Sequence, residues 1–364
     1  MTQFFLSALA AGICLIAIMW AVATFYLDGE NLARYDTDRG ERFASDRPAS
    51  PALAGAMARL ATGQPPADTP KAQRLAVRRA LFDRMFSERV SAASFTPIAV
   101  DGVTGEWVLA PGADPNRRLL YLHGGGFVLG SPLSHRTITT RFSALTGCAV
   151  LALDYRLMPE HKRMALDEDS RTAYRWMLEH GPAGKAPAQV VFVAGDSAGA
   201  NLTLTLLAWV RDNGLRAADA AVVISPPTDS TFNAPSMRAN VDSDFMLGPV
   251  VKPLLRVPHT LRLWLGWLNS GIRPSDPLIS PVFGDLSRLP PLLVHVSETE
   301  MLYDDARRYV NRAREAGSPA RLQSWNHTLH VWHIFNPELP EAEEAFAEIG
   351  KFLDAAAPQR KPAP

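Results

Sequence analysis

Eight short apolar runs lie between residues 94 and 325, each bounded by glycine, proline or polar residues. Segments with helical character follow the later runs, at residues 170–180, 198–213 and 302–316, and an amphipathic stretch at 338–356 closes the series. Near-continuous apolar strands that alternate with helices are typical of a mostly parallel sheet covered on both faces. We therefore expect an α/β fold whose strands are SFTPIAV, EWVLA, LLYLH, AVLALDY, VVFVAG, AAVVIS, PLLVHV and ARLQSW.

Residues 4–27 differ from the rest of the chain because they contain no charged side chain. This run of 24 residues is long enough to cross a hydrocarbon core of about 30 Å as a helix. A cleaved signal peptide is the main alternative, because Ala21-Val22-Ala23 resembles a small-residue cleavage site, and a buried helix is a second. The segment lacks the basic start of a signal peptide and exceeds its usual apolar length of about 7–15 residues. We expect a single-pass membrane anchor.

The charges of the chain are balanced, with 37 Lys and Arg against 37 Asp and Glu. No net field draws such a chain to nucleic acid, so we expect no nucleic-acid partner. The nearest cations, Arg34, Arg39, Arg42 and Arg47, all follow the apolar segment. The positive-inside rule therefore favours a cytoplasmic catalytic domain, but acidic residues lie among these arginines and the side of the membrane stays open. The oligomeric state stays open as well.

A second region, residues 28–92, separates the anchor from the strands. It begins with a polar, proline-containing stretch that is typical of a linker, and helical segments follow at 51–61 and 71–90. We expect these helices to cap the domain that follows.

The third region, residues 93–358, holds the strands and is the expected catalytic domain. Its connection from 226 to 291 is too long for a plain crossover and carries its own apolar helix at 261–268. Long connections of this kind are usually functional insertions. We expect a lid at about residues 230–275.

A G-x-S-x-G sequence, Gly195-Asp196-Ser197-Ala198-Gly199, stands between an apolar strand and an amphipathic helix. This context is the one in which a serine sits on a strained strand-to-helix turn with its hydroxyl exposed at the edge of the sheet. Phosphate binding is the alternative for such a turn, but no lysine follows the glycines as it does in a P-loop. We expect Ser197 to be a nucleophile and Asp196 to be structural.

The sequence His123-Gly124-Gly125-Gly126 directly follows another apolar run. Glycines let backbone N–H groups approach a ligand without obstruction by a Cβ atom. Attack on an ester creates an oxyanion, and fixed donors aimed at that oxygen lower the barrier. We assign these donors to the N–H groups of Gly125, Gly126 and Ala198. We expect His123 and Gly124 to support the loop rather than to react.

Four motifs occur in order: HGGGF at 123–127, DYRLMPEH at 154–161, GDSAGAN at 195–201 and a long stretch at 276–306. Together they resemble the hormone-sensitive-lipase-like branch of the α/β-hydrolases. An N-terminal membrane segment before such a domain also resembles the arylacetamide deacetylases. The resemblance implies an α/β-hydrolase fold with a mostly parallel eight-stranded sheet and a helical lid. It also implies carboxylic-ester hydrolysis by a serine triad, with no metal or organic cofactor.

The triad acid of this fold follows the penultimate strand, which here is PLLVHV. The candidates are Glu298, Glu300, Asp304 and Asp305. The two aspartates fall where a helix begins, so a favourable interaction with the helix dipole is their simpler role. Glu300 aligns with the acid of the family in the pattern acid-x-L-x-D, although many relatives carry Asp there. We assign the acid to Glu300, with Glu298 and Asp304 as alternatives.

Three histidines, His327, His330 and His333, follow the last strand at intervals of three. A zinc site is one interpretation, but H-E-x-x-H is absent and the stretch holds no carboxylate, so we expect no metal. The family places its catalytic histidine five residues past the strand's tryptophan, which here is His330. His327 stands where relatives often have glycine. We assign the general base to His330.

We expect a serine esterase that acts on small-molecule esters with short to medium, apolar acyl groups. Amide, formamide or lactone hydrolysis on the same triad is one alternative, because these reactions share the nucleophile and the oxyanion. A non-catalytic receptor on the same fold is another, although such receptors lack the triad histidine. One departure from the family, Lys162-Arg163-Met164 in place of a proline-containing turn, is expected to alter the rim of the site.

Overall fold

The protein is described here by a computed structural model that covers residues 2–44, 46–87 and 92–359. Its main sheet has nine strands in the order β1-β11-β10-β9-β8-β4-β5-β3-β2. The pairs β2–β3 and β3–β5 are antiparallel and the other pairs are parallel. The strands are β1 (Glu41–Phe43), β2 (Ser94–Val100), β3 (Val103–Leu109), β4 (Asp114–Leu122), β5 (Cys148–Asp154), β8 (Val190–Asp196), β9 (Ala220–Ile224), β10 (Leu292–Ser297) and β11 (Ala320–Trp325). The mostly parallel sheet and its eight predicted strands are confirmed, while β6 (His180–Gly181) and β7 (Gly184–Lys185) form a separate hairpin.

The number of strands in the main sheet was wrong by one, because part of the expected linker forms β1. This strand pairs in parallel with β11, with Glu41 opposite Gln323 and Phe43 opposite Trp325. The rings of Phe43 and Trp325 stack with centroids 4.3 Å apart. A strand of three residues is too short to show an alternating pattern, so only its partner reveals it.

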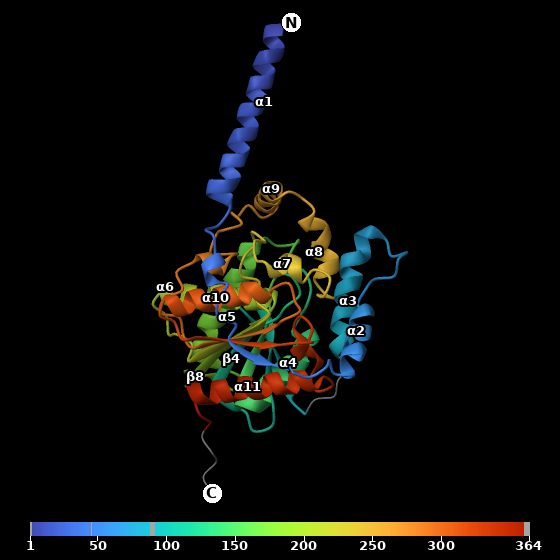
Figure 1. The fold of residues 1–364 in the computed structure, drawn as a ribbon. Coiled ribbons are helices and arrows are strands. Elements are labelled where there is room, and N and C mark those ends of the chain that lie inside the picture. Colours follow the sequence, from blue (N-terminus) through green and yellow to red (C-terminus); the bar gives the residue numbers. More distant parts are fainter. Residues whose placement is uncertain (1, 45, 88–91, 360–364) are drawn as a thin grey trace.

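Helices cover both faces of the sheet (Figure 1). Helices α5 (Arg163–Glu179), α6 (Ala198–Asp212) and α10 (Tyr303–Glu315) pack on one face, and α4 (Arg136–Thr146) and α11 (Pro340–Ala356) on the other. Successive residues of β4 divide between the two cores, since Leu120 and Leu122 join the first and Leu119 and Tyr121 the second. Side chains alternate along a strand, so the near-continuous apolar runs supply both cores at once.

The remaining helices lie outside these layers. Helices α2 (Ala52–Ala61) and α3 (Arg74–Ser87) come from the N-terminal region, and α7 (Ser236–Ala239), α8 (Gly248–Leu255) and α9 (His259–Ser270) lie in the insertion between β9 and β10. Helix α1 (Thr2–Val22) continues into a π-helical turn, Ala23–Leu27, and projects from the end of the molecule that carries α9 (Figure 1). Residues Phe4–Leu27 form one helix of 24 residues that is long and apolar enough to cross a membrane.

Candidate active site

Strand β8 ends in a sharp turn that carries Ser197 into α6. Ser197 has φ 49° and ψ −118°, a conformation that is unfavourable for a residue with a Cβ atom. A Cβ atom at Gly199 would lie 1.9 Å from the carbonyl oxygen of Leu122, so this position must be glycine for α6 to begin against β4. The turn holds Ser197 only partly exposed, while its neighbours are buried. Strained turns of this kind present a reactive hydroxyl.

Two other loops at the carboxyl ends of the strands bring a histidine and a carboxylate to Ser197. His330, in the loop after β11, accepts a hydrogen bond from Ser197 Oγ at its Nε2 over 2.9 Å. Its Nδ1–H donates to Glu300 Oε2 over 2.8 Å. Glu300 lies in the turn between β10 and α10, and both Glu300 and His330 are buried. Ser197, His330 and Glu300 are thus joined in series by two hydrogen bonds, an arrangement that is suited to nucleophilic catalysis.

Three backbone N–H groups near Ser197 come from the glycine loop and from the start of α6. In the described part of the chain, the N–H groups of Gly125, Gly126 and Ala198 have no protein acceptor. Gly125 has φ 117° and Gly126 has φ 62°, values that favour glycine. A Cβ atom at Gly124 would lie 2.1 Å from Asp196 Oδ2, so the glycine loop lies directly against the serine turn. Unpaired donors beside a nucleophile are suited to hold a developing oxyanion.

A family model for the alpha/beta hydrolase fold matches residues 119–334. The chain belongs to this family. The hydrolase is 40% identical over 260 residues to an acetyl-hydrolase of Streptomyces hygroscopicus, a match that covers 71% of this chain and 82% of the relative. It is 35% identical to a carboxylesterase/phospholipase, LipF, of Mycobacterium tuberculosis, over 72% of this chain and 69% of that protein.

Solved structures extend the comparison. The hydrolase resembles an esterase from the bacterial hormone-sensitive lipase family with a TM-score of 0.73 and 36% identity, over 85% of this chain and 99% of that one. It resembles EstE5 soaked with p-nitrophenyl butyrate with a TM-score of 0.72 and 35% identity, at the same coverage. The resemblance to the hormone-sensitive-lipase-like branch is therefore confirmed.

The pKa values of His330 and Glu300 are both raised, and each group influences the other. Burial disfavours the imidazolium, but the adjacent Glu300 carboxylate outweighs it and holds the pKa of His330 above its usual range. Burial raises the pKa of the Glu300 carboxyl, while His330 and a hydrogen bond from Ser225 act in the opposite direction. A carboxylate that stabilises the imidazolium helps the base to accept a proton from the serine.

The other acidic candidates are held elsewhere. Glu298 accepts hydrogen bonds from Arg42 Nε at 2.7 Å and Ser324 Oγ at 3.0 Å. Asp304 forms an ion pair with Arg307 at 2.8 Å and accepts a hydrogen bond from the N–H of Ser236 at 2.8 Å. Asp304 also lies in the first turn of α10, as expected. Neither Glu298 nor Asp304 forms a hydrogen bond with His330.

The three spaced histidines do not converge on one point. His327 is exposed at φ 56°, which explains why glycine suits this position. His333 is buried and its Nε2 lies 3.1 Å from Nδ1 of His295, whose Nε2–H donates to Gln323 at 2.9 Å. Within residues 2–44, 46–87 and 92–359, no group of three or more His, Cys, Asp or Glu residues is arranged to hold a metal ion.

Asp196 and His123 brace the glycine loop of the hydrolase. Asp196 Oδ1 accepts hydrogen bonds from Tyr121 Oη at 2.6 Å and from the N–H of Gly124 at 2.9 Å. Burial would raise the pKa of Asp196, but His135 and the hydrogen bond from Tyr121 outweigh it and lower the pKa. His123 donates from Nδ1 to the carbonyl of Gly124 at 2.8 Å, and burial lowers its pKa to about 3, which keeps the ring neutral.

Of the three residues expected to alter the rim of the site, Lys162 and Met164 are exposed and Arg163 is buried. Its guanidinium is buried in an ion pair with Asp167 and lies 4.7 Å from the ring centre of Phe127 in the glycine loop. It also donates to Asn201 Oδ1 of α6 at 2.8 Å. Arg163 therefore connects the glycine loop at 123–127 to helix α6, which follows Ser197. A cation over an aromatic ring is a stabilising contact where water is excluded.

Sequence reasoning missed three residues that hold the segments of Glu300 and His330. Ser225, after β9, has φ 52° and accepts the N–H of Val331 at 3.2 Å, next to His330. Asn240 of the insertion donates to the carbonyl of Glu300 at 2.8 Å, and Asp244 accepts the N–H of Met301 at 2.9 Å. The position of Ser225 at the end of a central strand was the available signal. The other two contacts span about sixty residues and leave no local pattern.

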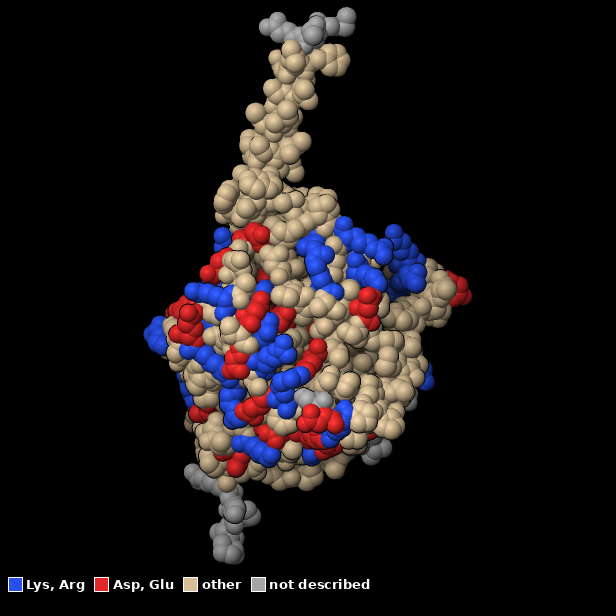
Figure 2. Space-filling model, viewed as in Figure 1, with Lys and Arg blue, Asp and Glu red and all other residues tan. Residues whose placement is uncertain are grey.

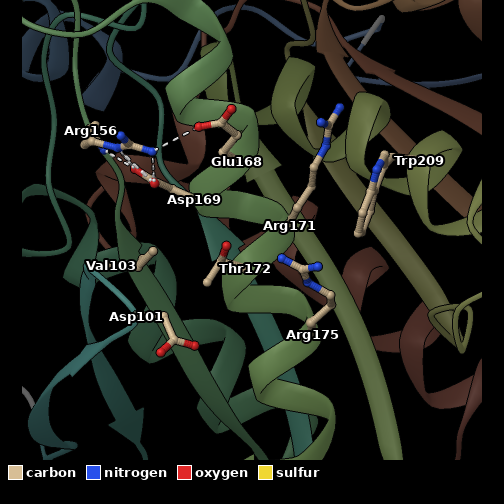
Figure 3. Close-up of a pocket in the computed structure, with 9 residues that line it drawn as sticks. All are labelled: Asp101, Val103, Arg156, Glu168, Asp169, Arg171, Thr172, Arg175 and Trp209. Atoms are coloured by element: carbon tan, nitrogen blue, oxygen red, sulfur yellow. Dashed lines mark hydrogen bonds and ion pairs between the residues drawn. The ribbon is translucent and has the colours of Figure 1, made fainter.

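A separate hollow of about 430 Å³ lies away from the triad. Figure 3 shows Arg156 paired with Asp169 on one wall, with Arg171 and Arg175 of α5 beside Trp209 of α6. The guanidinium groups of Arg171 and Arg175 lie 5.3 and 5.7 Å from the Trp209 ring centre. The hollow is lined by none of the proposed catalytic residues.

Proposed function

We infer that this hydrolase is a carboxylic ester hydrolase, and we propose that Ser197, His330 and Glu300 are its catalytic triad. The observation that carries the proposal is the unbroken series of hydrogen bonds from Ser197 Oγ through His330 to Glu300, at 2.9 and 2.8 Å. The esterases and the acetyl-hydrolase among its relatives support the same class of reaction.

In the proposed mechanism, Ser197 Oγ attacks the ester carbonyl carbon while His330 Nε2 takes the hydroxyl proton. The carbonyl oxygen becomes an oxyanion that accepts hydrogen bonds from the N–H groups of Gly125, Gly126 and Ala198. The C–O bond to the alcohol then breaks, and His330 returns its proton to the leaving alkoxide. Water attacks the acyl-enzyme by the same route, which releases the carboxylic acid and restores Ser197.

We propose that the hydrolase prefers esters with short to medium acyl groups. Acetyl-hydrolase activity in a relative and the soaking of p-nitrophenyl butyrate into a related structure support this range. In a series of p-nitrophenyl acetate, butyrate, octanoate and palmitate, kcat/KM should peak at butyrate or octanoate. The matched anilides should react more slowly, because an amine is a poorer leaving group. A maximum at palmitate would contradict the preference, and faster cleavage of the anilides would favour the amidase alternative.

We also propose that residues 4–27 anchor the hydrolase in a membrane as a single span. The segment is a helix that contains an apolar 18-residue window which is 0% buried inside the protein, and only its end, at Ala23 and Leu27, packs against the rest of the chain. After an alkaline carbonate wash, the full-length chain should stay in the membrane pellet with an intact mass that includes the first residues. Release of a shortened chain that begins after Ala23 would establish a cleaved leader instead.

A further inference from the structure

Helix α9 carries an apolar face that no part of the described chain covers. Leu261, Leu265 and Leu268 are 46%, 46% and 73% exposed. Their spacing of four and three residues places them on one side of the helix. Val250 of α8 adds an exposed fraction of 63%. Soluble proteins seldom leave several large aliphatic side chains exposed together, and such patches mark contact with a protein or a membrane.

This face begins where the proposed membrane span ends. Ala23 and Leu27, at the end of the span, pack with Leu263 of α9 in one buried cluster. Trp264 Nε1 donates to the carbonyl of Met19 at 3.1 Å, and a ring N–H of His259 donates to Asp28 at 2.8 Å. Figure 1 shows α9 at the base of α1. A bilayer that α1 crosses therefore comes to the level of α9.

The surroundings of this face suit a membrane surface. Trp20 and Tyr26, near the end of the span, are 55% and 51% exposed. Indole and phenol rings are enriched at the boundary between lipid and water. Figure 2 shows Lys and Arg side chains gathered over α8 and the start of α3. The exposed cations of these segments are Lys71, Arg74, Lys252 and Arg256, of which Lys252 is paired with Asp242. Clusters of cations attract anionic headgroups.

We propose that the exposed face of α9 lies in the headgroup region of an anionic bilayer, and that the hydrolase takes ester substrates which partition into that bilayer. The inference rests on the proposed esterase activity and on the proposed anchor. The insertion that carries α9 also contacts the catalytic machinery, because its Asn240 and Asp244 hold the turn of Glu300. A substrate that leaves the bilayer at α9 would therefore contact the insertion whose Asn240 and Asp244 hold the turn of Glu300.

The test places a polarity-sensitive fluorophore on α9 of the full-length chain. Leu268→Cys is made together with Cys14→Ser, while Cys148 is buried and is not labelled. Lys351→Cys on α11 is the matched control, because its side chain is 72% exposed on a helix of the opposite end of the molecule. The protein is reconstituted in vesicles of phosphatidylcholine and phosphatidylglycerol that contain a nitroxide-labelled lipid. Emission at position 268 should fall roughly two-fold or more, and emission at 351 should stay unchanged.

The same sample separates the possible failures. Equal emission at both positions, in protein that sediments with vesicles and hydrolyses a soluble ester, would overturn the membrane contact of α9 alone. Chain that does not sediment would overturn the anchor, and loss of hydrolysis would overturn the proposed function. A blue shift at 268 without quenching by the lipid would assign the face to a second copy of the chain.

A second measurement tests the source of the substrate. Leu265→Asp places a charge in the middle of the apolar face, where headgroup insertion would be opposed. The rate on an ester dissolved in vesicles, divided by the rate on a soluble ester, should fall several-fold relative to the unmodified chain. Leu268→Met, which keeps an apolar side chain, should preserve the ratio. An unchanged ratio in Leu265→Asp would overturn the delivery of substrate from the bilayer.

Discussion

Substitution Ser197→Ala is expected to lower kcat of ester hydrolysis by roughly a million-fold, the loss seen when a triad nucleophile is removed from a serine hydrolase. Without the Oγ atom no acyl-enzyme forms, and His330 has no hydroxyl to deprotonate. The residual rate would come from the N–H groups of Gly125, Gly126 and Ala198 and from substrate binding. Initial rates on p-nitrophenyl butyrate measure the loss. Intact mass after treatment with a fluorophosphonate should give one adduct on the unmodified chain and none on the variant.

Ser287→Ala is the matched control, because this serine lies in the loop before β10 and its N–H donates to Asp285 at 2.8 Å. It should keep full activity and accept one adduct. Labelling of Ser197→Ala at the normal rate would place the nucleophile elsewhere. Absence of any adduct on folded, unmodified chain would mean that the triad does not activate its serine. The non-catalytic receptor would then be the better description.

The fold and the strained turn at Ser197 could be predicted because both leave local patterns. The eight predicted strands are apolar runs, and the turn at Ser197 requires glycines at fixed positions around it. Strand β1 leaves no such pattern, since three residues pair with β11 from more than 250 positions away. Helix α4 was not expected, because its polar surface and short length hide the buried Ile138 and Phe142.

The choice of acid was harder because spacing alone admits several carboxylates. Glu298 and Glu300 are two residues apart, and the partner of each comes from a distant part of the chain. Arg42 of β1 binds Glu298, while His330 binds Glu300. Family resemblance selected Glu300, and the structure places Glu300 against the histidine. The role of Arg163 was also beyond local patterns. Asp167 is a neighbour on the same helix, but Asn201 and Phe127 come from two other segments of the chain.

Substitution Glu300→Gln is expected to lower kcat by roughly ten thousand-fold and to shift its pH dependence. Catalysis needs neutral His330, so activity is lost as pH falls through the pKa of this histidine. Glu300 holds the pKa of His330 above its ordinary value, which is about 6.5. The unmodified chain should therefore lose activity at a pH above that value. Glutamine removes the charge that favours the imidazolium, so the remaining activity should persist to lower pH.

Glu298→Gln is the matched control, because it makes the same chemical change two residues away in a side chain that binds Arg42. It should keep nearly the full rate. In profiles of kcat/KM against pH, its activity should be lost on acidification at the same pH as in the unmodified chain. Glu300→Asp keeps the charge on a shorter side chain and should recover part of the rate lost in Glu300→Gln. If Glu298→Gln lost as much activity as Glu300→Gln, the carboxylate that orients His330 would not be Glu300 alone. If Glu300→Gln lost activity at the same acidic pH as the unmodified chain, the Glu300 carboxylate would not set the pKa of His330.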